Sequence, residues 1–180
     1  MDRGVKEFFN SKTFTVVGTS RDSKNVGHII FKNLLKANKR VFGINPKANK
    51  LLGQRIYNDL FEIPYKVDCV IIAVPAKFVP LVLRQAGKLK IKCAVIISSG
   101  FSETHNNQLE EQLFKIAEQE NIKVLGPNTF GYLNTKENIN TTFFSGEIKK
   151  GSTSFISQSG AIGSAVLDSI DSLNSFIGIG

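Results

Sequence analysis

Short apolar runs alternate with amphipathic helical segments through residue 125 of this 180-residue chain. Within the helical segments the apolar side chains recur every three or four residues, as Val79, Val82, Leu83 and Ala86 do. Such an alternation builds a parallel sheet with right-handed crossover connections, so the pattern predicts an α/β fold. The predicted strands are 13–18, 40–45, 54–57, 68–74, 93–98 and 123–125, and the predicted helices are 26–37, 78–90 and 106–120.

Two of these strands, 68–74 and 93–98, are almost continuously apolar, which is typical of strands covered on both faces. They hold the two cysteines of the chain, Cys69 and Cys93. A cysteine in a buried strand usually behaves as an unreactive small hydrophobic residue. The low cysteine content favours a reducing, cytoplasmic setting.

The alternation stops after residue 125. Residues 126–147 are rich in Asn, Thr, Gly and Phe, and predict a long irregular connection. A strand over 153–157, a helix over 160–169 and the start of a strand over 176–180 follow. We therefore expect one domain over 1–149 and the beginning of a second over 150–180, in the N-terminal part of a longer protein.

The chain is basic, with 23 Lys and Arg against 15 Asp and Glu and a formal net charge of +8. A positive balance favours anionic ligands. Because the basic residues form no long block, they indicate a solvated surface with one anion site, and we expect no nucleic-acid partner. No apolar run approaches the roughly 20 residues of a membrane-spanning helix, so no membrane association is expected.

The segment 16–27 joins the first strand to the first helix and predicts a phosphate-binding turn. Backbone N–H groups and the dipole at a helix start attract phosphate. The turn also contains donors and cations, namely Gly18, Thr19, Ser20, Arg21, Lys24 and Asn25. The alternative interpretation is an ordinary loop with Ser and Asn helix caps.

The end of the second strand narrows the class of ligand. A dinucleotide site for NAD places an acidic residue there to hold the ribose hydroxyls. This chain has no carboxylate between Ser23 and Lys50, and Lys47 stands in that region instead. A lysine suits a ribose that carries a phosphate, as in NADP or coenzyme A. A lysine that only faces solvent is the alternative.

Two further loops leave neighbouring strands at their carboxyl ends, where open α/β sheets bind their ligands. The first contains Val74, Pro75 and Phe78, and the second contains Ser98, Ser99 and Gly100. Pro75 is expected to stiffen its turn, and Ser99 and Gly100 to expose backbone donors. Simple capping of the following helices is the alternative.

Ser159 and Gly160 open the last predicted helix and repeat the phosphate-cradle pattern. The segment is no nucleophile elbow, because that motif requires a glycine at position 157. His28 and His105 have no metal-ligand spacing to the cysteines. We expect both histidines to be structural or surface residues, and we expect no metal site.

Taken together, these motifs resemble the CoA-binding domain of the NDP-forming acyl-CoA synthetases, the superfamily of the succinyl-CoA synthetase alpha subunit. The ADP-forming acetate–CoA ligases look most similar. The matching segments occur in chain order as VVGTSRD (16–22), INPKA (44–48), IIAVPA (71–76), VIISSGFSE (95–103), LGPN (125–128) and SQSGA (157–161).

The resemblance implies a Rossmann-like CoA-binding domain followed by the start of a flavodoxin-like ligase domain. It implies that the Gly18–Arg21 loop holds the CoA diphosphate and that Lys47 meets the CoA phosphates. Val74, Pro75 and Phe78 would flank the adenine or pantetheine, and Ser98, Ser99 and Gly100 would follow the pantetheine arm. Ser159 and Gly160 would cradle the phosphate that becomes phosphohistidine.

In that family acyl-CoA and phosphate give an acyl phosphate, and the phosphoryl group passes through a histidine to ADP on an ATP-grasp unit. The resemblance places that histidine, the ATP-grasp partner, ATP or ADP and Mg beyond residue 180. It therefore implies no catalytic residue in this chain, which binds CoA or acyl-CoA and is inactive alone. Two alternatives stay open: a CoA-sensing module fused to a protein-lysine acyltransferase, and an NADP-binding reductase domain.

Overall fold

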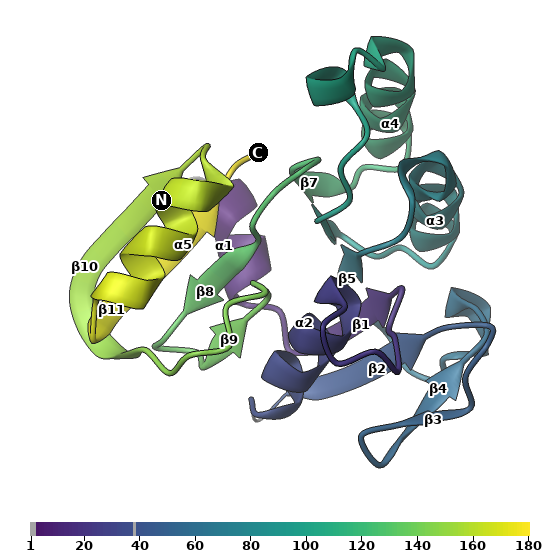
Figure 1. Cartoon of the computed structure of the whole chain (residues 1–180). Coiled ribbons are helices and arrows are strands. Elements are labelled where there is room, and N and C mark those ends of the chain that lie inside the picture. The colour runs from purple at the N-terminus through teal and green to yellow at the C-terminus, as the bar shows by residue number, and fades with distance from the viewer. Residues whose placement is uncertain (1–2, 38) are drawn as a thin grey trace.

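The computed structural model describes residues 3–37 and 39–180. Two sheets lie side by side, one of seven strands and one of four (Figure 1). The first sheet with α2, α3 and α4 occupies the right of the view, and the second sheet with α5 occupies the left, where α1 also lies. The first sheet carries most of the predicted ligand-binding residues.

The seven-stranded sheet has the order β3-β4-β2-β1-β5-β6-β7. Its strands are β1 (Thr13–Val17), β2 (Arg40–Ile44), β3 (Lys50–Leu51), β4 (Gln54–Tyr57), β5 (Cys69–Ile72), β6 (Cys93–Ile96) and β7 (Lys123–Leu125). All neighbours are parallel except β3 and β4, which form an antiparallel edge. From β1 the chain first builds outward through β2 and β4, and it then returns to place β5 on the other side of β1. The strand order therefore reverses between β1 and β5.

Helices cover both faces of this sheet. α1 (Arg3–Phe9) and α2 (Val26–Leu35) pack on one face, and α3 (Val79–Lys88) and α4 (Asn107–Gln119) pack on the other. Alternate residues of β5 pack against opposite helix layers, since Ile71 packs with α2 and Ile72 packs with α3. Single 3₁₀ turns precede α3 and α4 or follow β4: η1 (Leu60–Glu62), η2 (Ala76–Phe78) and η3 (Ser102–Thr104). None of the helices in the described residues is long and apolar enough to cross a membrane.

The alternation of strands and helices expected through residue 125 is confirmed. Each predicted element is present, and each of its ends lies within two residues of the prediction. Val79, Val82, Leu83 and Ala86 form the buried face of α3, as the periodicity indicated. α1 and the two-residue strand β3 were not predicted.

The prediction of an irregular connection over 126–147 is wrong in its middle. β8 (Tyr132–Asn134) and β9 (Ile139–Asn140) form an antiparallel hairpin there. Asn138 lies in its turn with a positive φ of 53°, a conformation that asparagine tolerates well. Tyr132 ties the hairpin to α1, because its hydroxyl donates to Phe8 O at 2.8 Å. The strands are too short for their alternation to be recognised.

The four-stranded sheet has the order β10-β11-β8-β9. β10 (Lys149–Ser157), α5 (Gly160–Ser169) and β11 (Ser172–Gly178) form a parallel strand–helix–strand unit, and β8 pairs antiparallel with β11. β10 and β11 each begin four residues before their predicted starts. The domain boundary between residues 149 and 150 stays a prediction. It would place β8 and β9 in a different domain from β11, although all three belong to one sheet.

Cys69 and Cys93 are buried opposite one another on β5 and β6. Burial raises the pKa of the Cys69 thiol well above its usual value and that of Cys93 to about 12. A thiol reacts as the thiolate. We therefore expect the native protein to leave Ellman's reagent unreacted at pH 8 and to react at both thiols after unfolding in guanidinium chloride. Rapid labelling of the native protein would contradict this.

Candidate functional site

A cleft of about 510 Å³ opens at the carboxyl ends of β4, β2, β1 and β5. This is where the strand order reverses, which is the preferred ligand position in open α/β sheets. Its walls come from the loops after these four strands and from α3. The predicted residues that line it are Gly18, Thr19, Ser20, Asn25, Val74, Pro75 and Phe78.

The loop after β1 is packed so closely that only glycine fits at its start. Gly18 has a φ of +100°, and a Cβ there would lie 2.2 Å from Ala73 O. Gly27 lies on the same crowded path, since its Cβ would lie 2.1 Å from Gly18 O. The backbone of the loop therefore runs against the end of β5, and Asn25, the N-cap of α2, lines the cleft.

Two polar side chains of this loop hold its shape. Thr19 is buried and its hydroxyl donates to Ile44 O at 3.2 Å, so the expectation that it offers a donor to a ligand is wrong. Asn25 is the N-cap of α2 and accepts from Gly27 N at 2.9 Å, as the alternative interpretation held. The backbone amides of Gly18 and Thr19 also donate to Ile44 O, at 3.0 and 3.2 Å. Donors for a phosphate must therefore come from later in the loop, including the Ser20 hydroxyl.

Asn45 joins the loops after β1 and β2. Its Nδ2 donates to Thr19 O, and its Oδ1 accepts from Lys47 N at 2.8 Å. An asparagine before a proline at the end of a strand is a recognised turn signal. The residue belongs to a quoted motif, but the sequence did not reveal that it holds the loop after β1.

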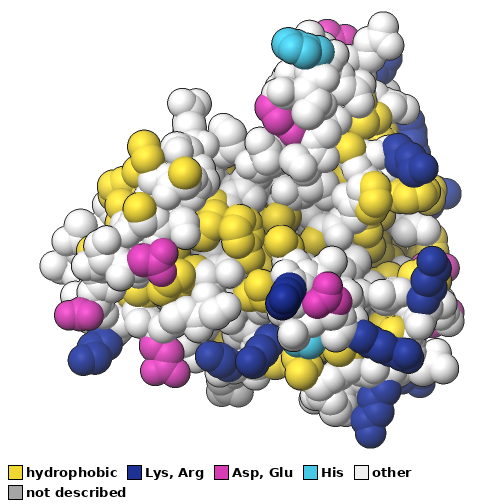
Figure 2. Space-filling view, viewed as in Figure 1, with side chains coloured by type: hydrophobic (Ala, Val, Ile, Leu, Met, Phe, Trp, Pro, Cys, Tyr) yellow, Lys and Arg dark blue, Asp and Glu magenta, His cyan; other side chains and the backbone are white. Residues whose placement is uncertain are grey.

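The three predicted cations lie outside the lining of the cleft. Arg21, Lys24 and Lys47 are exposed, and none of them forms an ion pair within the described residues. Lys47 directly follows Pro46, which does line the cleft. Figure 2 shows Lys and Arg side chains spread over the lower and right-hand parts of this face, around α2 and the edge strands. These cations are thus free to meet an anion at the mouth.

The loop after β5 supplies an apolar wall. Val74 and Pro75 lead into η2, where the Phe78 ring is 47% exposed with Lys77 Nζ 5.1 Å from its centroid. One turn further on, Leu81 lines the cleft with 58% of its surface exposed. Exposed large apolar side chains around a hollow are typical of a ligand-binding surface.

The loop after β6 does not line this cleft. Ser98 Oγ donates to Val74 O at 2.5 Å, so the hydroxyl braces the neighbouring loop. Ser99 is exposed. The expectation that Gly100 exposes a backbone donor is wrong, because Gly100 N and Phe101 N both donate to the Glu103 carboxylate. Partial burial acts to raise the pKa of Glu103, but these backbone hydrogen bonds hold it below its usual value.

Ser159 and Gly160 belong to the second sheet. Ser159 is the N-cap of α5, and its Oγ accepts from Ile162 N at 3.3 Å. Neither residue lines the cleft, so the structure does not bring the two predicted phosphate cradles into one pocket.

His28 forms a hydrogen bond with the backbone of the loop after β1. It is buried in α2, and its Nδ1 lies 2.7 Å from Ser20 O as a hydrogen-bond partner. His105 is exposed and ends η3 with a positive φ of 63°. Over residues 3–37 and 39–180, no three His, Cys, Asp or Glu side chains gather closely enough to hold a metal ion.

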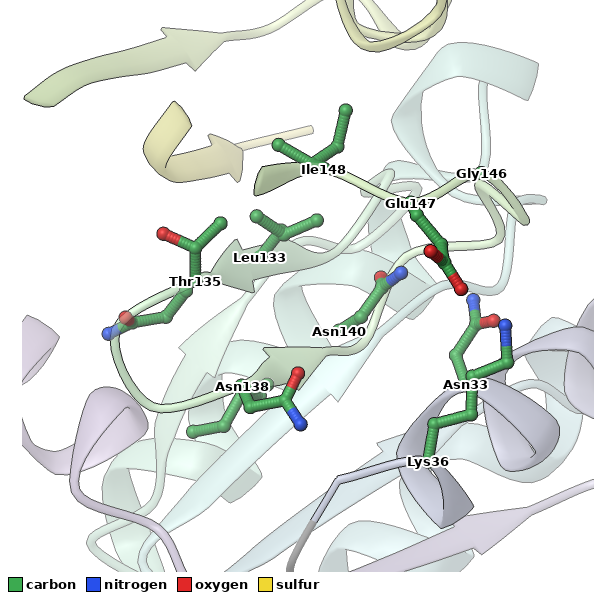
Figure 3. A pocket seen from close by; sticks show the side chains of 11 residues that line it. Asn33, Lys36, Leu133, Thr135, Asn138, Asn140, Gly146, Glu147 and Ile148 are labelled. Atoms are coloured by element: carbon green, nitrogen blue, oxygen red, sulfur yellow. The ribbon is translucent and has the colours of Figure 1, made fainter. Parts of the chain in front are cut away.

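A separate polar cavity of about 340 Å³ lies between the end of α2, the β8–β9 hairpin and the loop before β10. Figure 3 shows Glu147 pointing from that loop toward Asn33 on α2. Asn33 Nδ2 donates to Thr142 O and Phe144 O, at 3.0 and 2.8 Å. None of the predicted site residues lines this cavity.

The main cleft combines a tight glycine loop, a helix N-terminus and an apolar wall at the reversal point of a parallel sheet. This arrangement defines a class, the α/β domains that bind phosphorylated nucleotide-type ligands. The family model described as "CoA binding domain" matches residues 12–135. The chain therefore belongs to the CoA-binding domain family.

Several relatives of known activity are similar over nearly the whole chain. An ADP-forming acetate–CoA ligase of Methanocaldococcus jannaschii is 39% identical over 173 residues, which are 96% of this chain and 25% of the ligase. The alpha subunit of ADP-forming acetate–CoA ligase II of Pyrococcus furiosus is 39% identical over 163 residues, covering 89% of this chain and 35% of the subunit.

A solved structure matches equally well. The dinucleotide-forming acetyl-coenzyme A synthetase 1 of Ca. Korarchaeum cryptofilum, in complex with phosphate and ADP, superimposes with a TM-score of 0.93 at 38% identity. The match covers 98% of this chain and 39% of that one. The chain thus spans between a quarter and two fifths of the length of these relatives and corresponds to their CoA-binding region.

Proposed function

We propose that the cleft at the β1–β5 reversal binds coenzyme A, and that the chain is the CoA-binding part of an ADP-forming acyl-CoA synthetase. The observation that carries this proposal is one cleft in which a phosphate-type loop faces an apolar wall. Coenzyme A has both chemistries, a phosphorylated adenosine diphosphate and a long, largely uncharged pantetheine arm. Membership of the CoA-binding domain family supports the same ligand.

The diphosphate lies against the loop of Gly18, Thr19, Ser20 and Arg21, with the start of α2 behind it. Lys24 and Lys47 neutralise phosphate charge at the mouth. The wall of Val74, Pro75 and Phe78 packs against the adenine or pantetheine. From there the arm follows Ser98, Ser99 and Gly100 along the ends of β5 and β6.

The remainder of the acyl transfer requires groups supplied by other parts of a larger enzyme. The relatives named above are ligases or ligase subunits several times longer than the matched region. We propose that an ATP-grasp domain or subunit binds ATP or ADP with Mg, and that Ser159 and Gly160 belong to the ligase domain that begins near residue 150. In this proposal the chain binds CoA, and the group transfer requires the other parts of the enzyme.

Lys47→Ala tests the phosphate contact. A charge-assisted hydrogen bond to phosphate contributes about 1.5–3 kcal/mol, so we expect CoA to bind about ten- to a hundredfold more weakly in calorimetry. The wild type should bind dephospho-CoA, which lacks the 3′-phosphate, more weakly than CoA by a similar factor. The Lys47→Ala protein should bind dephospho-CoA and CoA with equal affinity.

Lys115→Ala is the matched control, because it removes the same charge from an exposed position on α4, away from the cleft. It should leave the affinity for CoA unchanged. If Lys47→Ala binds CoA as the wild type does, Lys47 faces solvent and the 3′-phosphate must be held elsewhere.

A further inference from the structure

The cleft contains a carboxylate that the phosphate loop does not supply. Asp59 lies in its lining and comes from the turn between β4 and η1. No acidic residue lies near the end of β2. The fold instead brings Asp59 to the same cleft from the end of β4. Spacing along the chain could not reveal this, because β4 lies next to β2 in the sheet.

Asp59 lines the cleft from the end of β4, which is two strands away from β1 and its following loop in the sheet order. The phosphate loop leads into α2 on one face of the sheet, whereas Leu60 and Val82 belong to the hydrophobic core on the α3 face. Leu60, Leu81 and Val82 add apolar lining to the same cleft. A ligand with its phosphates at the loop would therefore extend its other end toward this acid.

The hydrogen bonds of Asp59 leave one oxygen free. Oδ1 accepts from Phe61 N at 2.7 Å and caps η1. Oδ2 has no hydrogen-bond partner within the described residues, and the carboxylate forms no ion pair there. The cap fixes the orientation of the half-buried side chain, so the free oxygen is a preorganised acceptor.

We infer that Asp59 reads the base of the bound nucleotide by accepting a hydrogen bond from the exocyclic amino group of adenine. The inference rests on the proposed binding of coenzyme A. The apolar walls suit a flat purine, and the free carboxylate oxygen suits the N6 amino group at its edge. A base with a carbonyl oxygen at that position would place two acceptors against each other.

The test compares coenzyme A with its hypoxanthine analogue, in which a carbonyl oxygen replaces the amino group. A site built for one hydrogen-bonding pattern discriminates strongly against its reverse. We expect the wild type to prefer CoA by about tenfold or more, the order of one good base contact. Asp59→Asn retains the helix cap through its oxygen and turns an amide donor toward the base. It should lose this preference and favour the hypoxanthine analogue.

Asp168→Asn is the matched control, since it removes the same charge from an exposed position on α5. It should keep the preference of the wild type, and thermal unfolding should show both variants folded. If Asp59→Asn weakens both ligands equally, Asp59 contacts the ribose and the inference is wrong. If it changes neither, the carboxylate does not touch the ligand and the inference is also wrong, while coenzyme A binding stands. If the wild type binds neither ligand, the proposed function itself fails.

Discussion

Gly18→Ala is expected to lose stability and coenzyme A binding together. At a φ of +100° the alanine Cβ would lie 2.2 Å from Ala73 O, a backbone atom that cannot move without displacing the end of β5. The strained backbone and the overpacking together should cost about 3 kcal/mol or more of unfolding free energy. Urea denaturation measures that loss, and calorimetry at low temperature measures the binding of CoA to the folded fraction.

Gly53→Ala separates backbone strain from crowding. Gly53 also has a positive φ, +79°, but no atom lies within 4 Å of its added Cβ. This variant should lose about 1 kcal/mol or slightly more, the cost of the conformation alone, and should bind CoA normally. A Gly18→Ala protein as stable as Gly53→Ala would show that the loop relaxes freely. It would contradict the close packing that shapes the cleft.

Phe176→Ala is expected to have the largest effect on stability outside the first sheet. Phe176 on β11 is fully buried, with ring centroids 5.7 Å from Phe130 and 6.1 Å from Phe155. Truncating a buried phenylalanine to alanine costs about 3–5 kcal/mol. Urea denaturation should show a loss of this size.

Phe176→Leu is the control, because it keeps most of the buried volume and should lose much less stability. Both variants should retain the affinity of the wild type for CoA under conditions where they are folded, since Phe176 belongs to the core of the second unit and not to the cleft. Loss of CoA binding by a folded Phe176→Ala protein would mean that the four-stranded sheet contributes directly to the site.

The sequence predicted the first sheet well because its elements carry strong periodic signals. The run 68–74 is too apolar to lie anywhere but the centre of a covered sheet, and α3 repeats its apolar residues with helical spacing. The predicted position of the ligand site followed from the same reasoning, because carboxyl ends of parallel strands share an edge. The β8–β9 hairpin was missed because two- and three-residue strands carry no such period.

The details of the site depend on neighbours that sequence spacing does not reveal. The hydroxyl of Thr19 resembles a ligand donor until the structure shows Ile44 O as its acceptor. Gly100 resembles an open amide until Glu103 is placed beside it. Asp59 carries no motif at all, and only the pairing of β4 with β2 brings it to the cleft.

The most direct test of the account is a calorimetric titration of the chain with coenzyme A and with NADPH. Both ligands carry a phosphorylated adenosine, but only coenzyme A has a pantetheine arm to lie along the wall of Val74, Pro75 and Phe78. The account predicts saturable binding of coenzyme A with a higher affinity than that of NADPH. Tighter binding of NADPH, or no binding of coenzyme A, would contradict it.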